Sequence, residues 1–214
     1  MNRSLKIILL LFLSINFSQL SLGEQIDSEE VIKYVSSYNI NAIKSLGPDV
    51  MPILSDLYLV SDIKQKRVIA NIFYQLKLES EEAKNALIQD VKTNDENLRI
   101  SVQYALGRVS SNQEVVDALL DNMQHDNNAY FRDKAACALA YDQIHLTDLE
   151  KIRMYEGLIK GLSSSNGQVR SIAIKALKIH TGQTKGFFVN GTARNQSESL
   201  RKWHQWLDEY KSNL

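Results

Sequence analysis

Four segments of the sequence repeat one helical pattern, and each carries an arginine at the same register. The arginines, 32, 33 and 38 residues apart, are Arg67, Arg99, Arg132 and Arg170. Counted from each arginine, position +3 is Ala or Val, position +6 is Phe or Ala, and position +7 is Tyr or Leu. Apolar residues at these three positions form one face of a helix. A period of this length indicates stacked structural repeats.

A second helix is expected in front of each of the last three arginine helices. These expected helices cover residues 81–91, 115–123 and 151–162. Ser80 precedes the first, and capping boxes at Ser111–Glu114 and Thr147–Glu150 open the other two. Short polar turns separate the members of each pair. Each repeat is therefore predicted to be a helix, a turn and a helix.

The composition agrees with an all-helical chain. Nine Gly and two Pro in 214 residues are too few turn formers for a many-stranded β fold. A helical pair cannot bury its apolar face alone, so the units must stack. We predict an all-α, right-handed α-solenoid of about four repeats over residues 48–180, with capping helices at both ends.

Two of the segments resemble a known repeat family. Asp95-Glu-Asn-Leu-Arg99, followed by Ala105-Leu106-Gly107, and Gly167-Gln-Val-Arg170, followed by Ala176-Leu177, are similar to the second helix of HEAT or HEAT-like repeats. The resemblance covers about residues 49–180, and the first unit departs from it with Phe73 and Tyr74 in place of Ala-Leu. Armadillo repeats, which usually have three helices, fit less well. The resemblance implies an α-solenoid that acts as a scaffold, and it implies no reaction.

Residues 1–23 have the features of a secretory signal peptide. Arg3 and Lys6 precede an apolar run over residues 7–13, and small residues lead to a cleavage point after Gly23. The alternative is an uncleaved anchor, but the apolar run is much shorter than the ~20 residues that span a bilayer. We therefore expect a periplasmic or secreted protein without stable membrane insertion after cleavage.

The two ends of the mature chain, residues 24–214, differ from its repeats. Residues 24–47 are expected to form an amino-terminal cap. Residues 181–214 hold a Gly-rich loop and a last helix, on which Trp203 and Trp206 fall on one apolar face. This closing segment resembles that of many secreted bacterial HEAT-repeat proteins. We expect the tryptophan helix to cover the end of the last repeat.

The four repeat arginines have a structural interpretation. Each lies in the first turns of its helix, where the helix dipole disfavours a cation. Partners are expected in the preceding turns, at Asp62, Asp95 and Asp126, or at helix-end carbonyls of an adjacent unit. We interpret the arginines as links between repeats, in preference to ligand-binding residues.

No residue pattern of catalysis or metal binding is found in the sequence. His125, His145, His180 and His204 are scattered, and only His180 and His204 are expected to come near each other. The single cysteine, Cys137, lies in an apolar helical run and is expected to be buried and inert. No P-loop, dinucleotide fingerprint or nucleophile elbow is present. We predict no enzymatic activity, no cofactor and no metal.

A partner is expected on the arginine helices, on the side opposite the core. Equal numbers of basic and acidic residues, 25 each, give no reason to expect nucleic acid. Positions +1, +4 and +8 are predicted to face outward, or else to be the packed side of short helices. From these positions the candidate partner-binding residues are Asn71, Gln75, Ile100, Gln103, Asp133, Ile174 and Lys178. Their mixed, weakly charged character suits a protein partner.

Three functions are compatible with the sequence. The first is a protein–protein interaction scaffold or adaptor in the cell envelope. The second is an accessory subunit or enzyme of HEAT-like type that acts on a protein-bound substrate. The third is a binder of cell-wall glycan or of a membrane surface. Asn190 and Asn195 begin glycosylation sequons, which matter in a eukaryotic secretory pathway.

Overall fold

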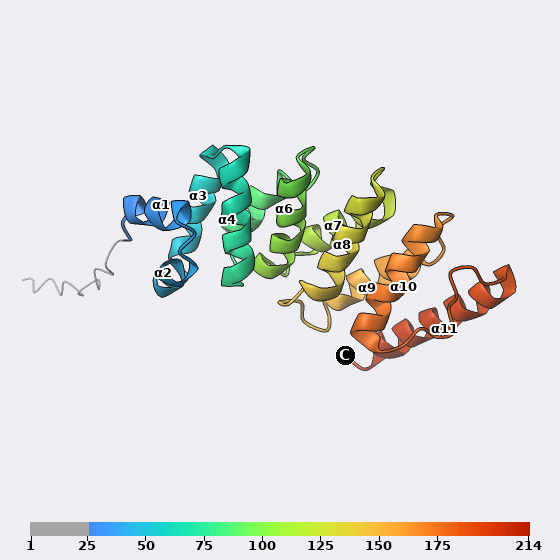
Figure 1. Ribbon diagram of the computed structural model, residues 1–214. Coiled ribbons are helices and arrows are strands. Elements are labelled where there is room, and N and C mark those ends of the chain that lie inside the picture. Colours follow the sequence, from blue (N-terminus) through green and yellow to red (C-terminus); the bar gives the residue numbers. More distant parts are fainter. Residues whose placement is uncertain (1–25) are drawn as a thin grey trace, which may run out of the picture.

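The structure is a computed structural model that describes residues 26–214 (Figure 1). Its helices are α1 (Ser28–Ser36), α2 (Ile40–Ser45), α3 (Val50–Val60), α4 (Ile63–Leu76), α5 (Glu81–Ile88), α6 (Glu96–Val109), α7 (Gln113–His125), α8 (Ala129–Tyr141), α9 (Lys151–Gly161), α10 (Gly167–Thr181) and α11 (Ala193–Ser212). No strand occurs within residues 26–214, and the predicted all-α, solenoid-like fold is confirmed. The right-handed superhelix stays a prediction. The predicted signal peptide and its cleavage after Gly23 lie outside the described residues.

Four helical pairs stack side by side in two layers (Figure 1). The first-helix layer consists of α3, α5, α7 and α9, and the second-helix layer consists of α4, α6, α8 and α10. In the second-helix layer each helix contacts the next, and the two members of every pair also contact each other. Each unit therefore buries surface against its neighbours along the chain as well as within itself.

The helices of the second-helix layer all begin with the same local device. The side chains of Asp62, Asp95, Asn128 and Asn166 are the N-caps and accept hydrogen bonds from backbone N–H groups of the first turn. An N-cap of this type satisfies a donor that the helix itself leaves unpaired. The polar turns in the sequence therefore contain the residues that start these helices.

Two of the three expected starts in the first-helix layer are as predicted. Ser80 accepts from the N–H of Ala83 at 3.1 Å, and Thr147 and Glu150 exchange the reciprocal bonds of a capping box before α9. The prediction of a capping box at Ser111–Glu114 is wrong. Asn112 is the N-cap there, because its side chain lies one residue nearer the helix and accepts from Glu114 at 2.9 Å.

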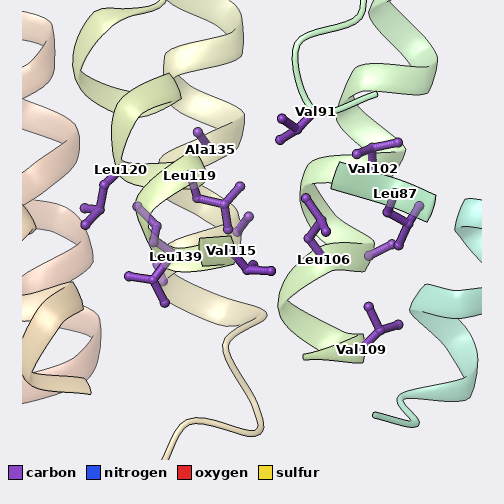
Figure 2. Packing of buried hydrophobic residues seen from close by; sticks show 14 of the residues in the cluster. Leu87, Val91, Val102, Leu106, Val109, Val115, Leu119, Leu120, Ala135 and Leu139 are labelled. Atoms are coloured by element: carbon purple, nitrogen blue, oxygen red, sulfur yellow. The ribbon is translucent and has the colours of Figure 1, made fainter. Parts of the chain in front are cut away.

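The apolar core runs continuously between the two layers. Figure 2 shows Leu106 on the side toward Val115 and Leu119 of the next pair, with Leu87 and Val102 behind it in the same cluster. Positions +3, +6 and +7 from the repeat arginines are buried as predicted, with Tyr74 in the first unit as the partly exposed exception. Burying such side chains is the main source of stability in a repeat array.

Helix α11 lies along α9 at the carboxyl end of the array. Trp203 is fully buried, and Trp206 is partly buried against Tyr155, with ring centroids 5.1 Å apart. Tyr210 donates to the carbonyl of Asp148 at 3.1 Å, near the start of α9. In residues 26–214 we find no helix with the length and apolarity that crossing a bilayer requires.

The capping role of α11 can be tested by removing its two tryptophan side chains. We expect Trp203→Ala combined with Trp206→Ala to lower the free energy of unfolding by about 3–5 kcal/mol, because a large aromatic cavity opens against α9. The control is His204→Ala with Gln205→Ala, on the exposed side of α11, which should change it by less than about 0.5 kcal/mol. Urea unfolding followed by circular dichroism measures both. Equal midpoints for the two double variants would contradict the capping role of α11.

Candidate functional site

Arg132 and Arg170 make the same contacts in two successive units. Nη1 of Arg132 donates to the carbonyls of Asp126 and Asn127, and Nη1 of Arg170 donates to those of Ser164 and Ser165. In both cases the acceptors lie six and five residues before the arginine. Each guanidinium therefore ties its helix to the turn that precedes it.

The other side of each guanidinium reaches the next segment of the array. Arg132 donates from Nε to Oε1 of Gln168 at 2.9 Å, and Arg170 donates from Nη2 to the carbonyl of Val189 at 3.1 Å. Arg132 thus bonds to Gln168 of the following unit, and Arg170, which has no following unit of this kind, bonds to Val189 in the loop before α11.

Arg99 uses a different acceptor from the one predicted. Its guanidinium forms a buried ion pair with Asp126 of the next turn and stacks 4.3 Å from the centroid of the Phe131 ring. The expected pairing with Asp95 is wrong, because Asp95 is occupied as the N-cap of α6. Burial lowers the pKa of Arg99, but the group stays charged at neutral pH. For the guanidinium of Arg67 the structure records no hydrogen bond or ion pair within residues 26–214, although the Arg67 backbone carbonyl accepts from Asn71 at 3.0 Å.

The arginines occupy the same position in their repeats, so alanine variants at these positions can be compared to test whether the recorded bonds stabilise the fold. Arg132→Ala and Arg170→Ala should each lower the free energy of unfolding by about 1–3 kcal/mol, because backbone carbonyls lose their donors. Arg67→Ala, which removes no recorded bond, should cost less than about 0.5 kcal/mol. Thermal or urea unfolding measures the difference. Equal losses at all three positions would show that the recorded bonds do not stabilise the fold.

The expected outward-facing strip is partly wrong. Gln103 is 0% exposed and Ile174 is 8% exposed, so both are buried. Asn71, Ile100 and Asp133 are half-buried, while Gln75 and Lys178 are exposed. Each inner helix of the layer contacts a neighbour on both sides, which buries a wider stripe than one packing face would. The side chains at position +4 of α6 and α8 are consequently covered, and Ile174 of α10, the last helix of the layer, is buried in the same core cluster.

The surface that does face solvent is formed by positions +1, +5 and +9 from the arginine, instead of the predicted +1, +4 and +8. We call it the second-helix face, and it consists of positions +1, +5 and +9 of α6, α8 and α10. Its residues, each half-buried or exposed, are Ile100, Tyr104, Arg108, Asp133, Cys137, Tyr141, Ser171, Lys175 and Ile179. On α4 the equivalent positions +5 and +9 are Ile72 and Leu76, which are buried, and α4 contacts α1 and α2. The face therefore begins at α6.

Arg108 is the fixed charge at one end of this face. Its Nη2 lies 2.7 Å from Oδ1 of Asp142, and its guanidinium lies 3.7 Å from the centroid of the Tyr74 ring. Burial raises the pKa of Asp142, an effect that the ion pair with Arg108 opposes. Gly107 lets the turn that contains Asp142 approach α6, because a Cβ there would lie 2.8 Å from the Asp142 carbonyl oxygen. The Arg108 side chain is thereby held in place by two partners, Asp142 after α8 and Tyr74 on α4.

Two titratable groups on the face, Tyr104 and Cys137, favour their neutral forms. Burial raises the pKa of the Tyr104 phenol, and nearby Cys137 adds to the shift. Burial also raises the pKa of the Cys137 thiol, assisted by Asp133. Cys137 is half-buried, so the expected full burial is wrong, yet the thiol is protonated at neutral pH and a poor nucleophile.

The histidines do not converge in the described part of the chain. Nε2 of His145 lies 2.9 Å from the Arg108 carbonyl, and Nε2 of His180 lies 2.9 Å from the Leu139 carbonyl. Each of these nitrogens must be a donor, and burial lowers the pKa of His180. His204 is exposed on α11. Within residues 26–214 no group of three His, Cys, Asp or Glu side chains is arranged to hold a metal ion.

A shallow hollow of about 320 Å³ lies between α7 and α9 on the first-helix layer. Its charges are partly paired, since Nε of Arg153 lies 2.7 Å from Oδ1 of Asp117. The hollow thus presents a polar surface in which Arg153 and Asp117 form an ordinary exposed ion pair.

Comparisons with known proteins give no family. No protein-family model matches the chain, and no curated protein matches it. Among solved structures, the chain is similar to an engineered protein determined by a structural genomics consortium, with 17% identity and a TM-score of 0.46. The similarity covers 87% of this chain and 94% of that chain.

Sequence reasoning missed the most exposed residues of the second-helix face. Tyr141, Lys175 and Ile179 lie at positions +5 and +9, next to the predicted positions +4 and +8. The pattern of polar and aromatic residues at +5 and +9 in the later repeats was the available signal. This pattern does not extend over all four repeats, because the first repeat has the buried residues Ile72 and Leu76 at those positions.

Proposed function

We propose that the protein is a HEAT-like repeat scaffold of the cell envelope, without enzymatic activity, that binds a partner protein on the second-helix face. The observation that carries this proposal is the composition of that face. Tyr141 is 62% exposed and Ile179 is 43% exposed at equivalent positions of adjacent helices, with Arg108 in the same row on α6. Tyrosine and arginine are enriched where proteins bind each other.

A binding role fits the way in which the polar groups are used. Asp142 is engaged by Arg108, and His180 is engaged by the Leu139 carbonyl. The Tyr104 and Cys137 side chains are held in their neutral forms by burial. An acid–base pair requires groups whose pKa values are tuned near neutral pH and that meet at one point. The described groups instead support packing and surface recognition.

The location in the cell envelope rests on the sequence pattern of residues 1–23. A basic start, a short apolar run and small residues before Gly23 are typical of a cleaved secretory signal. A single cysteine is compatible with an oxidising compartment, because no intramolecular disulfide can form.

The proposal predicts that loss of the face aromatics abolishes partner capture without unfolding the protein. We expect Tyr104→Ala with Tyr141→Ala to reduce retention of the partner from an envelope extract at least about tenfold, since central aromatic contacts dominate interface energy. The control removes exposed aromatics elsewhere, Tyr38→Ala with Phe188→Ala, which are 48% and 69% exposed. Quantitative pull-down with mass spectrometry measures retention, and the melting temperature shows that each variant is folded.

Two results would contradict the proposal. Equal retention by both double variants would place the partner away from the second-helix face. Retention lost only in the control would place it at the ends of the array. Gln103→Glu or Ile174→Glu would be a poor test, because both residues are buried and an unpaired buried charge would unfold the protein.

A further inference from the structure

The chain has no net charge, but its basic and acidic residues are divided unequally between the two layers of helices. The helices of the second-helix layer contain ten basic residues and two acidic ones, Glu96 and Asp133. The basic residues are Lys64, Lys66, Arg67, Arg99, Arg108, Arg132, Lys134, Arg170, Lys175 and Lys178. The helices of the first-helix layer contain four basic and seven acidic residues. Charge is therefore sorted by layer in a chain with no net charge.

Only some of these cations have carboxylate partners. Arg99 pairs with Asp126, Arg108 with Asp142, and Lys66 with Asp90. For Lys175 and Lys178 the structure records no ion pair within residues 26–214, and both side chains are exposed. Two cations one helical turn apart on α10 therefore have no counter-charge from the described chain.

These lysines lie beside the exposed apolar side chains of the second-helix face. Lys175 belongs to the face, and Lys178 directly precedes Ile179 on α10. On α8, Nζ of Lys134 lies 4.7 Å from the centroid of the Tyr130 ring, next to Asp133. Lys134 lies three residues before Cys137 on α8, and Lys175 occupies on α10 the position that Cys137 occupies on α8. Positive charge thus lies next to apolar surface on both α8 and α10.

We infer that the partner presents an acidic segment of polypeptide to this face, with its carboxylates at Lys175 and Lys178 and its apolar side chains on Tyr141 and Ile179. This inference rests on the proposed function and names the chemistry of the partner. Charge complementarity supports it, since opposite charges steer association and fix register. The exposed tyrosine and isoleucine on the same face as the lysines favour a polypeptide over a phosphate backbone, which is bound by dense Lys and Arg.

The direct test is binding of a labelled acidic peptide. The probe is a fluorescein-labelled peptide of twelve residues with the repeat Glu-Glu-Leu, and its counterpart carries Gln in place of Glu. We expect the purified full chain to bind the Glu peptide and to bind the Gln peptide at least about tenfold more weakly. Binding of the Glu peptide should also weaken as salt is raised from 0.05 to 0.5 M, because exposed charges are screened.

Matched charge reversals locate the site. Lys175→Glu with Lys178→Glu should weaken binding of the Glu peptide at least about tenfold. The control, Lys33→Glu with Lys160→Glu, makes the same change in net charge at exposed lysines on α1 and α9. Lys33, Lys160 and Lys178 each lie in the last turn of a helix, so the dipole effects are similar. The control should stay within about twofold of the wild type.

Cys137 supplies a readout that needs no substitution. It is the single cysteine of the chain and lies on the second-helix face, so a bound peptide should slow its alkylation by a maleimide. Unchanged alkylation at saturating peptide would place the peptide elsewhere and overturn the inference. Equal peptide affinity of the two charge-reversed variants would also overturn it.

Two other ligands are outcomes of the same experiment. The same assay is run with heparin and with phosphatidylcholine vesicles that contain 30% phosphatidylglycerol. If either binds more tightly than the Glu peptide, and the binding depends on Lys175 and Lys178, the inference is overturned in favour of a polyanion or a membrane. These results do not decide the proposed function. That proposal is tested by partner retention in the Tyr104 and Tyr141 variant, whose charge is unchanged.

Discussion

The structure depends on side chains of one unit that satisfy backbone carbonyls of another. The last carbonyls of a helix have no partner within the helix. The carbonyl of Val91, just after α5, accepts from Asn122 at 3.0 Å, and those of Arg108 and Leu139 accept from His145 and His180. Arg170 donates to the Val189 carbonyl of the closing segment in the same way, while Arg132 and Arg170 also bind the carbonyls of the turns inside their own units. Apolar burial drives the stacking, and these directional bonds fix the register of one unit on the next.

The helices and their buried faces could be predicted because they depend on local sequence. Apolar residues at +3, +6 and +7 identify the core side of α6, α8 and α10 without knowledge of their neighbours. The polar turns likewise contain the N-caps Asp62 and Asp95. The error at Ser111 arose because two adjacent polar residues can both cap, and the geometry selects Asn112.

The surface could not be predicted to the same degree, because it depends on how helices of different units meet. Gln103 is buried because α6 has neighbours on both sides, α4 and α8, and Ile174 is buried in the core cluster at the last helix of the layer. The partner of Arg99 lies 27 residues away, in a turn whose approach no local pattern specifies. The charge separation, in contrast, was present in the sequence. It becomes visible when charges are counted by helix rather than over the whole chain.

The central claim is that directional polar contacts between units stabilise the array, beyond apolar stacking alone. A double-mutant cycle on Arg99 and Asp126 tests this most directly, with Arg99→Met, Asp126→Asn and both together, measured by urea unfolding. The account predicts a coupling free energy of about 1 kcal/mol or more, because the pair is buried and joins adjacent units. Additivity of the two single changes within about 0.3 kcal/mol would contradict it.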